Sequence, residues 1–282
     1  MSKRRYYSAR SGKHPDNGKL DLPMTRRLFK DIFIAFQSKD YFQEAFGYDC
    51  VDAGPVCGTL GYDLEAQMLR KIRKPGLWPI ANNCLSYSED DLFDVIEFLF
   101  DYISKPIDGY HHSYSDCGWH YSSFNSDAGR SEWREEINQI LEDYQEGYEL
   151  SLNGEILSLP EKGFSNLLEA NLPAIDDENI GKRVEIAILK FRRYRSSFDE
   201  RRDAIRALAD VLEYLRPQLK TVLTKNDEGD LFNIANNFGI RHHNDQQKTD
   251  YDKAIWYSWI FYYYLATIHA AIRLIDKKGT ST

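Results

Sequence analysis

One stretch near the C-terminus restricts the possible folds more than any other feature of the sequence. From Ala254 to Ile272 the chain runs for 19 residues without a charged side chain, if His269 is counted as neutral. That length just meets the requirement for a membrane-spanning helix. However, Tyr257 and residues 262–264 place tyrosines within the stretch, whereas membrane spans concentrate tyrosine at the two interfaces. The pattern therefore favours the buried helix of a helical bundle, with a membrane span as the alternative.

The composition provides enough apolar surface to bury such a helix. Hydrophobic residues make up 42% of the 282 residues and aromatic residues 14%, which excludes a disordered chain and a disulfide-rich scaffold. A formal net charge of −8 argues against a uniformly basic nucleic-acid-binding protein. The charge is uneven, because residues 178–282 hold 18 Lys and Arg against 14 Asp and Glu, whereas residues 1–177 hold 18 against 30. The C-terminal part can therefore present a local basic surface to a polyanion.

The change in charge coincides with a connector at residues 171–181, so we place a domain boundary there. An N-terminal domain is expected over residues 1–175 and a C-terminal domain over residues 180–279. Asn153-Gly154 lies between two short apolar runs, and this pair predicts a β-hairpin at 147–160 with a two-residue type I′ turn. The rest of the N-terminal domain is predicted to be mostly helical. Its helices are expected at about 25–48, 62–73, 88–105 and 131–144.

The periodicity of the C-terminal domain predicts four helices. They are expected at about 182–195, 197–219, 227–238 and from 249 onward. The fold class is therefore predicted to be mainly α: an α-helical N-terminal domain with a small β-hairpin, followed by a C-terminal four-helix bundle.

A polar loop between the last two predicted helices carries the first candidate for chemistry. Arg241, His242 and His243 place one guanidinium and two imidazoles at consecutive positions. Imidazole titrates near neutral pH and suits general acid–base catalysis, and guanidinium stabilises charge on a phosphate. Together these groups are sufficient for metal-free cleavage of RNA. The alternative is a polar loop whose histidines cap the end of the preceding helix.

Arginines elsewhere in this domain are candidate nucleic-acid contacts. Arg216 lies near the apolar stripe of its helix, where it either lines a cleft or pairs with Glu213. A second group surrounds the junction of the first two helices, where five cations fall within eleven residues and can contact a phosphate backbone. That group consists of Arg192, Arg193, Arg195, Arg201 and Arg202. A solvated helix corner with nearby acidic residues is the alternative.

A cluster in the N-terminal domain has the residue types of a zinc site. His111, His112, Cys117 and His120 fall close together, and Cys117-x-x-His120 is a spacing that metal ligands use. No second Cys-x-x-Cys half accompanies it, and Cys50 and Cys57 are too far apart to form one. We therefore expect no metal and no cofactor, with zinc as the alternative.

The segment from Asn236 to His243 resembles a segment of bacterial abortive-infection proteins that carry a C-terminal HEPN-type bundle. Residues 7–12 and 117–120 also look like parts of the N-terminal domains attached to such bundles. The resemblance implies an all-α, dimerising domain that cleaves RNA without metal, and Asn237 matches a position of its motif. No arginine precedes His242 or His243 by four to six residues, as the family pattern requires, so Arg241 and Arg216 are the arginines assigned to the phosphate.

These observations predict an antiviral, metal-independent ribonuclease. His243, His242, Arg241 and Asn237 are its expected catalytic residues, acting in a homodimer on RNA. The alternative is a non-catalytic module that dimerises or binds RNA or a nucleotide. The chain carries four cysteines and no secretory leader, and we expect it in the cytoplasm, away from membranes.

Overall fold

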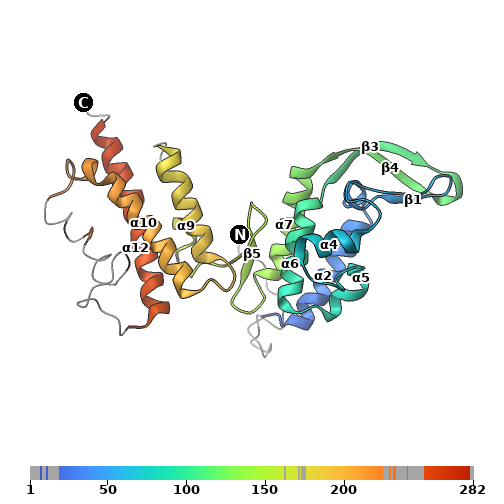
Figure 1. Ribbon diagram of the computed structural model, residues 1–282, viewed down its shortest axis with the longest axis horizontal. Coiled ribbons are helices and arrows are strands. Elements are labelled where there is room, and N and C mark those ends of the chain that lie inside the picture. The colour runs from blue at the N-terminus through green and yellow to red at the C-terminus, as the bar shows by residue number, and fades with distance from the viewer. Residues whose placement is uncertain are drawn as a thin grey trace. The chain divides into compact units, whose positions relative to one another are not determined.

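The computed structural model shows a mainly helical protein with small antiparallel hairpins (Figure 1). The chain divides into two compact units, residues 1–159 and 160–282. The structure describes residues 7, 11, 19–161, 163–170, 172, 176–224, 229, 231–232, 240 and 251–279.

The N-terminal unit combines helices with three two-stranded hairpins. Its helices are α2 (Leu22–Gln37), α3 (Gln43–Phe46), α4 (Leu64–Ile72), α5 (Ile80–Asn83), α6 (Glu89–Tyr102) and α7 (Ser126–Leu141), with short 3-10 turns at Cys84–Ser86 and Tyr114–Asp116. Its strands are β1 (Tyr48–Cys50), β2 (Gly54–Val56), β3 (Lys105–His112), β4 (Gly118–Asn125), β5 (Tyr148–Leu150) and β6 (Ile156–Ser158).

Aromatic side chains from α2 and α7 build the core of this unit. Trp133 of α7 is fully buried, and its ring meets Phe29, Phe36 and Phe42 edge to face. Edge-to-face contact is a preferred geometry for aromatic rings because the positive edge of one ring meets the negative face of the other. This core supports the helices from which the hairpins extend.

Local signals define where the helices begin. The hydroxyl of Ser88 accepts a hydrogen bond from the backbone N–H of Asp91, and the Asp91 carboxylate accepts one from the N–H of Ser88. This capping box satisfies two N–H groups that the first helical turn leaves without partners. The predicted start of α6 is confirmed.

The longest hairpin pairs β3 with β4 and extends away from the helices, with β1 beside it (Figure 1). The register places Tyr110 opposite His120 and His111 opposite Trp119. Gly109 is required where the strands approach, since a Cβ atom there would lie 2.3 Å from the carbonyl oxygen of His120. The pairing thereby fixes which side chains share a face of the hairpin.

The hairpin predicted at 147–160 is present as β5 and β6, but its turn differs from the prediction. A type I′ turn needs positive φ at both Asn153 and Gly154, and only Gly154 has it, at 84°. The N–H of Gly154 donates to the carbonyl of Ser151, whose own N–H donates to the carbonyl of Glu155. The loop therefore has three residues, with glycine in the left-handed position.

The C-terminal unit contains α8 (Ser165–Glu169), a π-helical turn (Asp177–Gly181), α9 (Lys182–Arg192), α10 (Phe198–Leu219) and α12 (Lys253–Gly279). The helices predicted near 182–195, 197–219 and from 249 onward are confirmed as α9, α10 and α12. Most of the helix predicted at 227–238 lies outside the described residues. In α12, Tyr264, Ile268 and Ile272 are almost fully buried, as expected for a bundle helix. Within the part of the chain that the structure describes, no helix meets the length and hydropathy needed to cross a membrane.

The C-terminal unit begins earlier than the connector predicted at 171–181. The ring of Phe164 stacks on Tyr262 of α12, with centroids 4.1 Å apart, and the hydroxyl of Ser258 donates to the carboxylate of Glu161. These contacts attach the segment after Pro160 to α12. A boundary read from composition cannot detect such packing, because the composition changes only later in the chain.

Candidate metal centre

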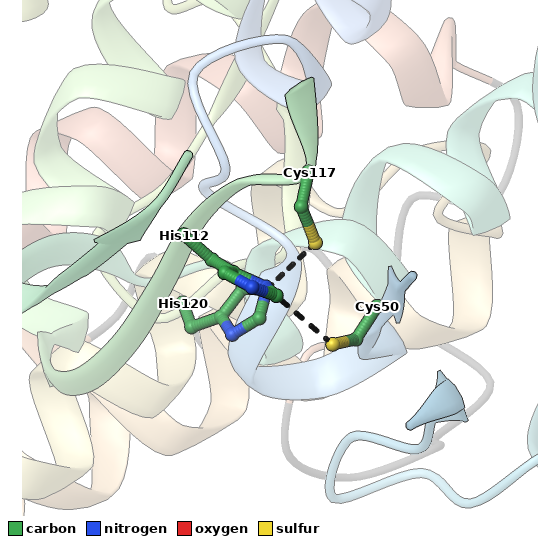
Figure 2. Close-up of side chains that lie close together, drawn as sticks. All are labelled: Cys50, His112, Cys117 and His120. Carbon is green, nitrogen blue, oxygen red and sulfur yellow. Dashed lines mark hydrogen bonds between the residues drawn. The ribbon is translucent and has the colours of Figure 1, made fainter. Parts of the chain in front are cut away.

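Four side chains with metal-ligating atoms converge beside the tip of the β3–β4 hairpin (Figure 2). Cys50 comes from the end of β1, His112 from the end of β3, Cys117 from the connecting turn and His120 from β4. One ligand atom from each residue lies within 4.8 Å of the other three. Two segments that are more than sixty residues apart in sequence therefore meet at one point.

The strand register explains why these histidines share a face. Residues directly opposite each other in an antiparallel pair point to the same side, and neighbours along a strand point to opposite sides. Tyr110 is opposite His120, so His112, two residues further along β3, lies on that same face. His111 is exposed on the other face, where its ring meets Trp119 with centroids 5.4 Å apart.

The distances suit a tetrahedral zinc ion. The Cys117 sulfur lies 3.2 Å from Nε2 of His120, and the Cys50 sulfur lies 3.8 Å from Nδ1 of His112. Around tetrahedral Zn²⁺, bonds of about 2.3 Å to sulfur and about 2.0 Å to nitrogen separate neighbouring ligand atoms by roughly 3.3–3.8 Å. These two cysteine–histidine pairs are thus at or near the spacing that coordination requires, and all four ligand atoms lie within 4.8 Å of one another.

Both histidines have a partner for the ring nitrogen that faces away from the thiol. Nδ1 of His120 lies 2.7 Å from the hydroxyl of Tyr110, and Nε2 of His112 lies 3.3 Å from a carboxylate oxygen of Asp52. Metal-ligating histidines almost always donate their second N–H to a carboxylate, carbonyl or similar group, which fixes the tautomer and orients the ring. Asp52 and Tyr110 meet this requirement.

The surroundings favour a thiolate at Cys50. Backbone N–H groups of Ala53 and Asp52 donate to its sulfur and hold the pKa of the Cys50 thiol below its ordinary value. His120 is 3% exposed, and the ring of Tyr48 lies against it with centroids 4.3 Å apart. A thiolate is the form that binds zinc, and partial burial excludes competing water.

The sequence identified three of the four residues. The inclusion of His111 is wrong, because it points to the opposite face of the hairpin, and so is the exclusion of Cys50, which joins the cluster without Cys57. The lack of a second closely spaced pair in the sequence does not exclude a metal site, since Cys50 and His112 supply that pair from different hairpins. One local signal was available: Cys50 precedes a tight turn, ending at Gly54, whose amides point at the sulfur.

The predicted catalytic residues Asn237, Arg241, His242 and His243 lie outside the described residues and stay predictions. Arg216 pairs with Glu213 at 3.1 Å, as one of the two interpretations expected, and its guanidinium also lies 4.4 Å from the centre of the Phe232 ring.

The other predicted nucleic-acid contacts lie around the corner between α9 and α10. Their described contacts are with different partners. Arg192 ends α9 and Arg193 caps it. The Arg195 guanidinium lies over the Tyr194 ring, 4.9 Å from its centre. Arg202 lies 3.4 Å from Asp199. Arg201, on the first turn of α10, packs over the ring of Phe191 of α9.

The cluster offers two sulfur and two nitrogen ligands, which is the full number that a tetrahedral zinc ion takes from protein in a structural site. Structural zinc sites have this composition, whereas catalytic zinc sites keep one position for water or substrate. The geometry therefore indicates a structural site. No protein-family model, curated protein or solved structure matches this chain.

Proposed function

We propose that the N-terminal unit is a zinc-binding module in which Cys50, His112, Cys117 and His120 hold one Zn²⁺. The observation that carries this proposal is the convergence of all four ligand atoms within 4.8 Å of one another. Two thiols with two imidazoles favour zinc over magnesium and calcium, which prefer oxygen ligands.

The ion would join two hairpins that also meet where Tyr48 packs against His120 and where His112 lies beside Asp52. Cys50 belongs to the β1–β2 hairpin, and the other three ligands belong to the β3–β4 hairpin and its turn. Each hairpin is a separate two-stranded sheet, which has little stability of its own in water, although Gln43 of α3 accepts from and donates to the backbone of β4. Zinc would therefore act as the structural centre of this end of the unit.

We expect the purified protein to contain one equivalent of zinc, and Cys117→Ser to lose it. Elemental analysis after gel filtration measures the content, and cobalt substitution provides a visible spectrum that reports tetrahedral thiolate coordination. Cys57→Ser is the matched control, because Cys57 is exposed and lies outside the cluster. His112→Ala should lose zinc as well, and His111→Ala is its matched control, because His111 lies outside the cluster.

Three results would argue against a zinc site. They are a protein that binds no zinc after expression with the metal, a Cys117→Ser variant that keeps its zinc, and equal losses in the Cys57→Ser and Cys117→Ser proteins. The last would indicate non-specific binding by thiols.

A second candidate function concerns the C-terminal unit. We propose that it cleaves RNA without a metal, with His243 as the base and Arg241 as a phosphate contact. One described contact supports this assignment. Ile240 is fully buried and its carbonyl accepts a hydrogen bond of 3.1 Å from Nε of Arg206, which ties the residue before Arg241 to α10. An anchored loop can hold reacting groups more precisely than a free one.

For this second candidate, His243→Ala is expected to abolish cleavage of a single-stranded RNA while the circular dichroism spectrum stays the same. Loss of a general base reduces the rate about 10²- to 10⁴-fold. The assay is run on zinc-loaded protein without added Mg²⁺, with Asn244→Ala as the control from the same segment. Equal cleavage by the wild-type and His243→Ala proteins would exclude the assignment.

A further inference from the structure

A pocket of about 470 Å³ lies within the C-terminal unit, between α12, the start of α10 and the segment before α8. Its lining includes Glu161, Phe164, Arg201, Ser258, Trp259 and Tyr262. This volume falls in the range of sites for small molecules. The pocket is separate from the zinc ligands, which all belong to the other unit.

One side of the pocket is aromatic. Trp259 is 45% exposed and Phe164 is 38% exposed, although both are large apolar side chains. Phe164 is held by stacking on Tyr262, at an interplanar angle of 12°. An ordered, partly exposed aromatic wall is suited to stacking against a planar ring.

The Arg201 guanidinium is the charged group of the pocket. It lies over the ring of Phe191, 5.5 Å from its centre, and its Nε is shielded from solvent without a hydrogen-bond partner. Among the residues that the structure describes, Arg201 forms no ion pair. The terminal guanidinium nitrogens, for which the described residues provide no hydrogen-bond partner, are the donors available to an anion in the pocket.

The nearby charged groups are engaged differently. Arg202, the next residue, also has an Nε shielded from solvent without a partner, but its Nη2 lies 3.4 Å from a carboxylate oxygen of Asp199 and it does not line the pocket. Glu161 accepts a hydrogen bond from the hydroxyl of Ser258 through Oε1, and its other carboxylate oxygen can accept from a ligand. The pocket thus combines an aromatic wall, an anion-binding group and a hydrogen-bond acceptor.

We propose that this pocket binds a nucleotide, either free or as one residue of an RNA strand. The phosphate would pair with Arg201, the base would lie against Trp259, and the free oxygen of Glu161 would accept a hydrogen bond from an exocyclic amine. Base–aromatic stacking and arginine–phosphate pairing are the two interactions by which proteins hold single nucleotides. The proposal depends on neither the zinc centre nor the segment containing His243.

Calorimetry with AMP on the full-length, zinc-loaded protein tests the proposal, supported by quenching of tryptophan fluorescence. Arg201→Gln is expected to weaken AMP binding about 10- to 100-fold, because a hydrogen bond to a charged group is lost. Arg202→Gln is the matched control and should bind AMP as the wild type does. IMP, which carries a carbonyl in place of the amine of adenine, should bind less tightly than AMP.

A single-stranded RNA ligand distinguishes the two sources of the nucleotide. If a single-stranded hexa-adenylate binds more tightly than AMP, and Arg201→Gln weakens both, the pocket accepts a residue of RNA; if AMP binds as tightly, it accepts the free nucleotide. Trp259→Leu should weaken both ligands while circular dichroism shows an unchanged fold. Absence of AMP and hexa-adenylate binding at millimolar concentration, or equal binding by the Arg201→Gln and wild-type proteins, would overturn the proposal.

Discussion

Removal of zinc is expected to lower the melting temperature of the N-terminal unit by about 8–16 °C. A ligand that binds only the folded state stabilises it by about 4 kcal/mol when its free concentration is 1,000 times the dissociation constant. Each kcal/mol shifts the melting temperature of a domain of this size by about 2–4 °C. The unit should stay folded after zinc is removed, because its aromatic core around Trp133 does not involve the ion.

The loss of stability after zinc removal should be confined to the two hairpins, and hydrogen exchange can locate it. After chelation, amides of residues 48–56 and 105–125 should exchange faster, whereas those of α2 and α7 should stay protected. Cys117→Ser should reproduce this pattern without chelator, and Cys57→Ser should not. Added zinc should restore the melting temperature of the chelated wild type but not that of Cys117→Ser. Identical melting and exchange with and without zinc would show that the ion does not join the hairpins.

The second large effect is expected from Trp133→Ala, which should destabilise the N-terminal unit by about 3–5 kcal/mol. The side chain is fully buried and contacts the rings of Phe29, Phe36 and Phe42. Its removal leaves a cavity that rigid aromatic neighbours cannot close. Since domains are stable by only about 5–15 kcal/mol, this variant should be close to unfolding.

Chemical denaturation monitored by circular dichroism measures this change. Trp119→Ala provides the matched control, because Trp119 is 47% exposed on the β3–β4 hairpin. Trp133→Phe should be much less destabilising, since it keeps an aromatic ring and removes an indole N–H that has no hydrogen-bond partner. A Trp133→Ala protein as stable as Trp119→Ala would show that the aromatic cluster is not the core.

The elements predicted correctly from sequence are those that local interactions determine. The capping boxes at Ser88 and Ser197 mark the starts of α6 and α10, because each uses atoms only three residues apart. The apolar run from Ala254 forms a helix as predicted, but only one face of it is buried, and Ile255, Trp256 and Trp259 are exposed. The turn at Gly154 was assigned to the wrong type. That glycine lies against the ring of Phe100, a residue far away in sequence.

The candidate metal site likewise combines features set by local sequence with features set by distant residues. The sequence by itself identified the pair Cys117 and His120, which lie only three residues apart where the connecting turn enters β4. Only the tertiary structure decided that His112 and not His111 joins them, since strand register selects the face of each side chain. It also added Cys50, 62 residues before His112. Contacts at that separation depend on how whole hairpins pack, and no local spacing in the sequence records it.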